Sequence, residues 1–471
     1  MSDDIPLGRV WVAVSRPETE EDAVGQGKRP ASRGVVRRNV KLKALRELVG
    51  KDRAIVAVDL ASQRQAAVVC DHDSVVLARR MFRGSAWCIS EILAWAGAVA
   101  ARAGFSGLVL ACEPTGHRWK PLVVTARAAR IPVVCVQPLL VHRGREGEDF
   151  TRSRSDFGDA VIIARLTAEL RCYLPYLPEG PWARLRHLGA RREGLVRRAV
   201  ASREQVRDLL ECAWPAVLEA AADPLESLTW RAALGVSADP AVIAGMSEQQ
   251  FLAALRERLV ALGGQKVWRR IAVAVHAAAA DPGGIAAERD AIIERAAFAY
   301  QDWMSALAAQ TEIEARMLAV LDELGLTALV TTIPGLSAVG AAVILAQTGD
   351  PARYDSPRTW VKHAGLAPQA NESGKYRGRT RGSGRGRPEL RTAAWRAMFG
   401  AVRCNRVYAA RLVFLTTRQV NRLSRGQAHT ALAAALLRQL HVVVTRRVPW
   451  DAAIASGTTM PADTQVVMPV A

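Results

Sequence analysis

Short apolar runs alternate with helical stretches from residue 54 of the chain onward. The runs AIVAVD, QAAVVC and SVVLARR come in close succession, and GLVLACE and PVVCVQ follow, each after a stretch of helical character (near 86–102 and 117–130). Apolar runs of about four to eight residues bounded by polar ones are typical of buried strands. Three successive strands, followed by strands that alternate with helices, predict a mixed sheet flanked by helices.

The next part of the chain shows helical periodicity over much longer stretches. Between about 182 and 330 it is rich in Ala, Leu, Arg and Glu, which predicts long amphipathic helices paired in an antiparallel or an intersubunit coiled coil. Pro and Gly interrupt the middle of this region, from about 222 to 285, and predict shorter helices there. The pattern of this middle part indicates no function.

Glycines punctuate apolar helical residues in TTIPGLSAVGAAVILAQTGD, which begins at Thr331. The spacing predicts two short helices joined by a turn, as in a helix-hairpin-helix element. Backbone N–H groups at the start of the second helix would form a seat for a phosphate, which makes Gly335 and Gly340 candidate nucleic-acid-binding residues. A hairpin that serves packing alone is the alternative.

The predicted fold class is therefore an α/β domain followed by a long helical connector and a mainly α-helical domain. We expect a basic flexible arm (1–53), the α/β domain (54–180), the connector (181–328), the helical domain (329–450) and a tail (451–471). The arm begins acidic and becomes basic, so its second half either touches a nucleic-acid backbone or is a solvated tail.

Composition narrows the partner and the compartment. The 64 Lys and Arg residues exceed the 45 Asp and Glu residues and give a net charge of +19, which indicates a polyanionic partner, nucleic acid first, unless the whole proteome is basic. The seven cysteines never form Cys-x-x-Cys, which is typical of reduced thiols rather than a disulfide framework or a zinc site. Because no apolar stretch reaches about 18 residues and no signal pattern opens the chain, we expect a soluble, cytoplasmic protein without a membrane partner.

Four carboxylates carry the candidate chemistry. Asp59 ends the first apolar run and Glu113 ends a later one, at the ends of strands where α/β sheets usually place their chemistry. Asp156 and Asp159 lie in the first turn of the helix predicted for SDFGDAVIIARLTAEL, on one face, whereas the polar stretch HRGREGEDFTRSR before it reads as a loop. Asp59 as a turn former and Asp156 as a helix cap are the alternatives, but the four together predict a two-metal nuclease site for Mg²⁺.

The segment ESGKYRGRTRGSGRGRPELR, which begins at Glu372, intersperses seven basic residues with glycines. So flexible and cationic a stretch is not expected to form a core, and a phosphate backbone is its natural contact. The hydroxyls of its two serines, Ser373 and Ser383, are ordinarily inert, yet guanidinium groups can favour serine deprotonation and stabilise a phosphoryl group in transfer. His363 is the nearest imidazole in sequence, and no base is evident beside either serine. The candidate phosphate-binding residues here are Lys375, Arg377, Arg379, Arg381, Arg385 and Arg387.

The motifs VAVDLASQ, ACEPTGH and SDFGDAVIIARL, followed by IPGLSAVGAAVILAQTGD and HAGLAPQANESGKYRGRTRGSG, resemble those of the DEDD transposases of bacterial insertion sequences and the related Piv-type DNA invertases. The resemblance covers most of residues 54–445 and keeps the motif order. Holliday-junction resolvases of the RuvC type share the DEDD tetrad alone. The downstream block that ends in ESG makes the match specific.

The resemblance implies an RNase H-like, RuvC-like domain, a coiled-coil connector and a C-terminal transposase domain. It implies that the four carboxylates bind Mg²⁺, and that Ser373 of the ESG motif is the nucleophile of a phosphoserine intermediate, in a site completed across subunits of a homodimer or homotetramer. It also implies donor and target DNA duplexes and a structured bridge RNA as partners, at the bacterial nucleoid. The long basic arm and the broken connector depart from the family pattern.

Two other functions remain open at this point. A RuvC-like, metal-dependent junction nuclease would use water as its nucleophile and leave Ser373 passive. A non-catalytic nucleic-acid scaffold would explain the charge alone. No G-x-x-x-x-G-K-[ST] loop occurs in the chain, which fits strand exchange without ATP because a serine–phosphate bond conserves the energy of the broken one.

Overall fold

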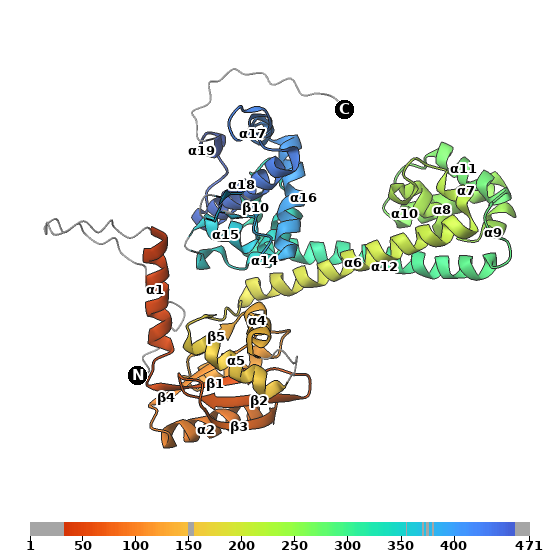
Figure 1. The fold of residues 1–471 in the computed structure, drawn as a ribbon. Coiled ribbons are helices and arrows are strands. Elements are labelled where there is room, and N and C mark those ends of the chain that lie inside the picture. Colours follow the sequence, from red (N-terminus) through yellow and green to blue (C-terminus); the bar gives the residue numbers. More distant parts are fainter. Residues whose placement is uncertain are drawn as a thin grey trace. The chain divides into compact units, whose positions relative to one another are not determined.

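The computed structural model describes residues 33–148, 155–354, 356–369, 372–373, 376–378 and 381–456. Figure 1 shows the helices and strands of these residues. The chain divides into two compact units, of which the first ends at Leu177 and the second begins at Pro178. Among the described residues, no helix combines the length and the apolar character that a membrane crossing needs.

The first unit is built on a mixed sheet that has six strands in the described residues, in the order β3-β2-β1-β4-β5-β6. β1 pairs antiparallel with β2 and parallel with β4, and β5 continues the parallel part. The strands are β1 (Arg53–Asp59), β2 (Arg64–Cys70), β3 (Val76–Arg83), β4 (Gly107–Cys112), β5 (Val133–Val136) and β6 (Cys172–Tyr173). The mixed sheet predicted from the apolar runs is confirmed, although β6, with two residues, is too short to leave a periodic signal.

Helices cover both faces of this sheet, which is why β1 reads as a continuous apolar run. Ala54, Val56 and Val58 point into a core with helices α2 and α3, whereas Ile55 and Ala57 point into a second core with α1, α4 and α5. The helices are α1 (Arg33–Leu48), α2 (Ala86–Arg102), α3 (Trp119–Ala128), α4 (Pro138–Glu148) and α5 (Asp156–Ala168).

Two segments of this unit differ from expectation. Part of the arm expected to be flexible is helix α1, because Leu45 and Val49 near its end are buried in the core of the sheet domain. Residues 1–32 of the arm lie outside the described residues. The expected loop before Asp156 is helical as far as Glu148, because Val141 anchors α4 in the same core.

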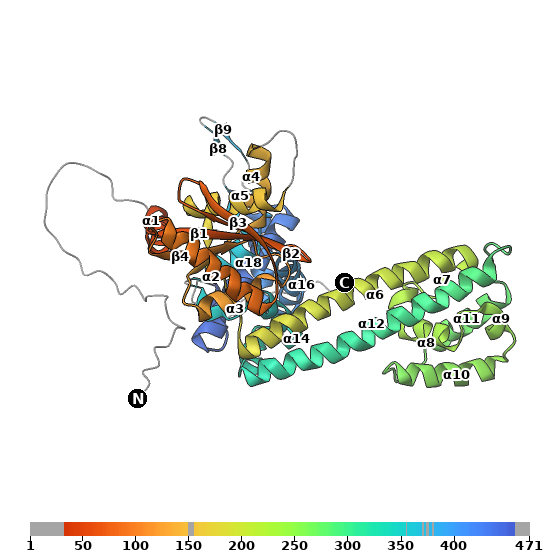
Figure 2. The same cartoon turned by 90° about the horizontal axis from the view of Figure 1, so that it is seen from below.

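The second unit begins with two long helices that run antiparallel, α6 (Gly180–Ala213) and α12 (Arg289–Glu323). Three ion pairs join the two helices, and their residue numbers rise along α6 while they fall along α12. These pairs are Arg184–Glu323 at 2.5 Å, Arg192–Glu314 at 2.7 Å and Arg198–Asp302 at 2.6 Å. Figure 2 shows the two helices side by side along their length. These two long helices therefore pair antiparallel within one chain.

Shorter helices occupy the chain between α6 and α12, as the Pro and Gly residues predicted. They pack around the buried side chains of Trp214, Trp230 and Phe251. We call residues 214–288 the helical module. Its elements are α7 (Pro215–Leu218), η1 (Pro224–Glu226), α8 (Leu228–Val236), α9 (Pro240–Ala244), α10 (Glu248–Ala261) and α11 (Arg269–Ala280).

The C-terminal part of the second unit is mainly helical, with a core that includes Trp360, Met398 and Tyr408. Its central helix α18 (Arg425–Arg446) begins at a capping box of Ser424 and Gln427. The other helices are α13 (Thr327–Val330), α14 (Ala338–Thr348), η2 (Pro351–Arg353), α15 (Pro357–His363), α16 (Pro388–Cys404), α17 (Arg406–Thr417) and α19 (Ala452–Ser456).

Candidate functional site

Two of the predicted carboxylates lie at neighbouring strand ends. Asp59 is the last residue of β1, and Glu113 directly follows β4. The parallel register pairs Val58 with Cys112, so Asp59 and Glu113 each come one residue after this pair. Both are partly buried.

The other two carboxylates lie in the first turn of α5. Ser155 caps this helix and accepts a hydrogen bond from the Gly158 N–H at 3.1 Å. The apolar face of α5 packs on the sheet through Ile163, among other residues. Asp156 and Asp159 therefore lie at the positive end of a helix that is anchored to the same sheet as Asp59.

Electrostatics shows that the four carboxylates share one neighbourhood. Burial raises the pKa of Asp59, and the charges of Asp159 and Asp156 raise it further. Burial also raises the pKa of Glu113, the positive charge of Arg145 opposes this rise, and Asp59 and Asp159 add to it. We call Asp59, Glu113, Asp156 and Asp159 the acidic quartet. Its members come from three segments that are far apart in the sequence.

Arg145 of α4 is the cation of this neighbourhood. Its Nε donates a hydrogen bond to Oδ1 of Asp159, whose side chain is only 14% exposed. Its charge also partly offsets the rise in the pKa of both Asp59 and Glu113. Sequence reasoning missed Arg145 because it lies in a polar stretch read as a loop, and no spacing signal distinguishes it from Arg143.

The acidic quartet suits a hard divalent cation by its chemistry, since carboxylate oxygens are the ligands that Mg²⁺ prefers. Within the described residues, however, no three side chains of His, Cys, Asp or Glu are close enough together to hold a metal ion. The positive charge next to Asp159 is instead the guanidinium of Arg145. The carboxylate ligands suit Mg²⁺, but in this arrangement they are too far apart to form the predicted metal site.

Ser373 lies in a small hairpin of the second unit. β8 (Glu372–Ser373) pairs antiparallel with β9 (Tyr376–Arg377), and Ser373 is opposite Tyr376. A second pair, β7 (Pro368–Gln369) with β10 (Arg381–Gly382), flanks it in sequence. Lys375 and Arg379 lie outside the described residues, as do the side chains of Ser373, Arg377 and Arg381.

The end of the Arg/Gly segment is held by backbone contacts that the sequence did not reveal. The Ser383 N–H donates to the carbonyl of Ala367, and the Gly384 N–H donates to that of Gly365, both at 3.0 Å. A Cβ at Gly386 would lie 2.4 Å from the backbone nitrogen of Gly365, so only glycine allows this approach. The segment was expected to lack fixed structure, yet these contacts order its last part.

The second candidate serine has its hydroxyl already engaged. Ser383 Oγ donates to the carbonyl of Arg385 at 3.3 Å. The side chain of Arg387 donates to Gln347 Oε1 at 3.2 Å, and the Arg387 N–H donates to the carbonyl of His363. Ser383, Arg385 and Arg387 thus belong to the ordered last part of the segment.

His363 is a neutral imidazole beside this ordered part of the segment. Burial lowers its pKa to about 4, and the charges of Arg387, Arg353 and Arg186 contribute. Its Nε2 is buried and has no hydrogen-bond partner among the described residues. The sequence pointed to His363 only as the nearest imidazole, and its burial depends on helix packing.

Gly335 and Gly340 line a groove of about 920 Å³ together with Arg192, Arg396 and other residues of the second unit. The structure gives both glycines other roles than the predicted phosphate seat. The Gly340 N–H already donates to the capping Oγ of Ser337 at 3.0 Å. Gly335 has a φ of +84°, and a Cβ there would lie 2.3 Å from the backbone oxygen of Gly400. Its glycine is therefore needed for packing.

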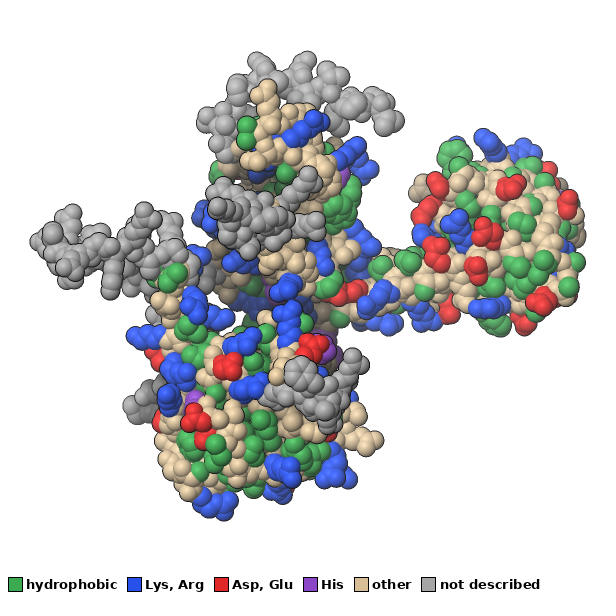
Figure 3. Space-filling view, in the orientation of Figure 1, with side chains coloured by type: hydrophobic (Ala, Val, Ile, Leu, Met, Phe, Trp, Pro, Cys, Tyr) green, Lys and Arg blue, Asp and Glu red, His purple; other side chains and the backbone are tan. Residues whose placement is uncertain are grey.

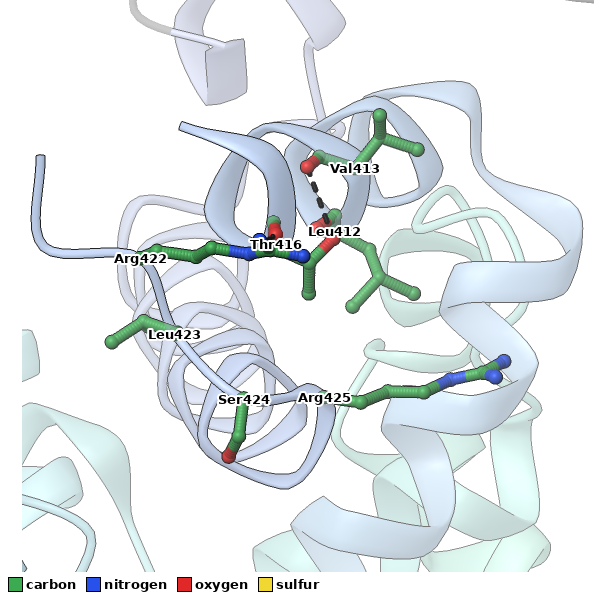
Figure 4. Close-up of a pocket in the computed structure, with 7 residues that line it drawn as sticks. All are labelled: Leu412, Val413, Thr416, Arg422, Leu423, Ser424 and Arg425. Atoms are coloured by element: carbon green, nitrogen blue, oxygen red, sulfur yellow. Dashed lines mark hydrogen bonds between the residues drawn. The ribbon is translucent and has the colours of Figure 1, made fainter. Parts of the chain in front are cut away.

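A pocket of about 570 Å³ lies between α17 and the start of α18 (Figure 4). The Thr416 hydroxyl donates to the carbonyls of Leu412 and Val413, and Arg422 Nε donates to the carbonyl of Thr416 at 2.6 Å. None of the predicted site residues lines this pocket, and these polar groups are satisfied within the chain.

Two family models match the chain. The DEDD transposase model of the IS110 type matches residues 56–215, which include the acidic quartet. The model described as transposase of the IS116/IS110/IS902 family matches residues 327–413, which include Ser373. Together the matches span just over half of the chain. A comparison with curated proteins finds no significant match.

Proposed function

Because the chain belongs to the IS110-type family of DEDD transposases, as its motifs predicted, we propose that it moves an insertion sequence through a covalent serine–phosphate intermediate. The family breaks and rejoins DNA strands, so the chain is a DNA-binding transposase. The observation that supports the finer proposal is that the chain combines this acidic quartet with a second matched segment, residues 327–413, which contains Ser373.

We assign the parts of the chain as follows. Residues 54–180 form an RNase H-like, RuvC-like catalytic domain, to which the strand order and the mixed pairing of β1 give support. Residues 181–328 are the connector, and residues 329–450 are the transposase domain that carries Ser373. In that domain, α13, the turn at Gly335 and α14 form the helix-hairpin-helix-like element.

The acidic quartet would hold the divalent metal on which this family typically depends. Bound there, Mg²⁺ would supply positive charge to a scissile phosphate and to the leaving oxygen. Burial is the main cause of the raised pKa values of Asp59 and Glu113, and neighbouring carboxylates add to it; a bound cation would relieve both effects.

Ser373 is the proposed nucleophile. Its hydroxyl oxygen attacks the phosphorus of a DNA phosphodiester while its proton passes to solvent or a nearby base. The P–O bond to one DNA strand end breaks as the serine ester forms, and the leaving oxygen takes up a proton. Attack by a hydroxyl of the new partner strand reverses these changes and releases the serine, so no ATP is consumed.

The basic residues of the Arg/Gly segment are the proposed phosphate clamps, Arg377, Arg379 and Arg381 above all, with Lys375 beside them. The ordered last part of the segment, at Arg385 and Arg387, attaches it to α15 and α14 and so supports its position. Since Gly340 and Gly335 serve capping and packing, we assign phosphate contacts at the groove to side chains such as Arg396.

A protein–DNA adduct tests the serine. The protein is incubated with Mg²⁺, its copurifying RNA and end-labelled DNA that carries the junctions of its own element, and adducts are resolved under denaturing conditions. We expect an adduct with the unaltered protein and with Ser383→Ala, and none with Ser373→Ala. An adduct that persists in Ser373→Ala, or moves to Ser383, would overturn the assignment.

The runner-up is a junction nuclease in which water attacks, and it also fits an acidic quartet. The same assay separates the two, because the nuclease would cut DNA without an adduct and would keep cutting in Ser373→Ala. A scaffold without catalysis predicts that Asp59→Ala and Asp156→Ala leave strand exchange unchanged.

A structured bridge RNA and a dimer or tetramer complete the proposal, since two duplexes must be handled together. Sequencing the RNA that copurifies with the protein tests the guide. A structured noncoding species encoded beside the protein's own gene is the expected result. Random fragments of cellular RNA would count against guided targeting.

A further inference from the structure

Helix α1 carries a charge that the described part of the chain leaves unbalanced. Its 16 residues include six basic residues and a single acidic one, Glu47. The side chains of Arg37, Arg38, Lys41 and Lys43 are all exposed, and none of the four forms an ion pair with a described residue. We call these four side chains the α1 basic set.

The C-terminal end of α1 is fixed to its own unit. Leu45 and Val49 are buried in the core, and Arg46 donates to the carbonyls of Val49 at 3.2 Å and Ala168 at 3.3 Å. Toward the other end, Val36 and Val40 are 50% and 54% exposed. The basic set therefore consists of exposed side chains on a helix that is anchored near its C-terminal end.

The charges of the set work against the helix that bears them. Arg37 and Lys41 are four residues apart, and Arg38 and Lys41 are three apart, so like charges are neighbours on the helix surface and repel each other. A free helix of this length is marginal in water. A polyanion along the helix would remove this repulsion, and a phosphate backbone supplies regularly spaced negative charge.

We propose that α1 is a binding surface for the phosphate backbone of duplex DNA, contacted by the α1 basic set. The partner follows from the charge of the helix and from the DNA binding of the family. The proposal does not depend on Ser373 or on the metal. It adds a contact outside the residues that either family model matches.

The test measures how affinity depends on salt. All four residues are replaced by glutamine in the full chain, and binding to labelled duplexes of about 30 base pairs is followed by fluorescence anisotropy at several salt concentrations. One probe is random-sequence DNA and the other is RNA of the same sequence. For DNA, the slope of log K against log salt should fall in magnitude by about 3 to 4, since each phosphate contact contributes about 0.9.

The helical module provides the matched control, because it has six basic and eight acidic residues and no charge excess to bind DNA. Figure 3 shows acidic and basic side chains mixed over its surface. The control variant removes the same charge at exposed positions, by glutamine at Arg256, Arg258, Lys266 and Arg270. Its salt slope should stay within about 1 of the unaltered protein.

The outcomes separate clearly. A smaller slope with the DNA probe supports the proposal, whereas a smaller slope with the RNA probe alone overturns it in favour of an RNA partner. An unchanged slope with both probes, or an equal change in the control variant, overturns it. At saturating DNA the α1 variant should still form the Ser373 adduct, so a failure of this inference is distinguishable from a failure of the proposed function. Unchanged circular dichroism confirms that each variant is folded.

Discussion

Replacing Gly335 by alanine is expected to loosen the packing between α14 and α16. The backbone of Gly335 has φ +84°, where an alanine is strained by about 1 kcal/mol. The added Cβ would lie 2.3 Å from the oxygen and 2.6 Å from the carbon of the Gly400 carbonyl. Because these are backbone atoms that cannot rotate away, α16 must shift, at a cost of about 2 kcal/mol or more. The expected total is about 3 kcal/mol.

Hydrogen exchange read out by mass spectrometry measures this locally, which suits a chain of two units that need not unfold together. Amides of α14 and α16 should lose protection by about 100-fold, the factor that corresponds to roughly 3 kcal/mol. Gly263→Ala is the matched control, because Gly263 has φ +80° but a Cβ there would meet nothing within 4 Å. It should cost only the strain, about fivefold in the neighbouring amides. Equal effects of the two variants would refute the close contact.

Three further predictions concern charged and titratable groups. Arg145→Ala should lower the melting temperature of the metal-free protein and tighten Mn²⁺ binding in calorimetry by about three- to tenfold, because a competing cation is lost. Arg143→Ala, which replaces an exposed neighbour, should have neither effect. Weaker metal binding by Arg145→Ala would mean that Arg145 supports the ion instead. The raised pKa of Asp59 means that the metal-free fold loses stability as pH rises through that pKa, so Asp59→Asn in EDTA should be more stable than the unaltered protein at neutral pH and no different in acid; a constant difference across the pH range would contradict this. Because the pKa of His363 is lowered to about 4, the folded protein should lose stability as pH falls from about 6.5 to 4. His363→Gln should therefore flatten the plot of melting temperature against pH in this range. An unchanged slope would show that another group titrates there.

The order of elements in the first unit could be predicted because its signals are local. The apolar runs became β1 to β5 within a few residues of their predicted bounds. Burial on both faces demands continuous apolar sequence in all of these strands except β3, which lies at the edge of the sheet and is mostly exposed or half-buried. The strand-end positions of Asp59 and Glu113 follow from the same runs. Their adjacency needed one further fact, the pairing of β1 with β4.

Contacts between distant positions are what the sequence could not supply. The role of Gly335 depends on Gly400, and the order at Gly386 depends on Gly365, in each case through backbone atoms that carry no side-chain signature. Arg145 looks like any arginine of a polar stretch, and only the packing of α4 on the sheet domain brings it to Asp159. The same limit explains why α1 was expected to be a flexible arm.

By itself, the sequence determined the chemistry that is present: four carboxylates in a telling order, a serine in a cationic segment, and the family to which these motifs belong. Periodicity and motif order are written along the chain, so they can be read without a fold. Only the tertiary structure decided which charges meet. It set Arg145 rather than a preformed cage beside Asp159, and it left the α1 basic set without a described acidic partner, because distances between side chains depend on how the elements pack.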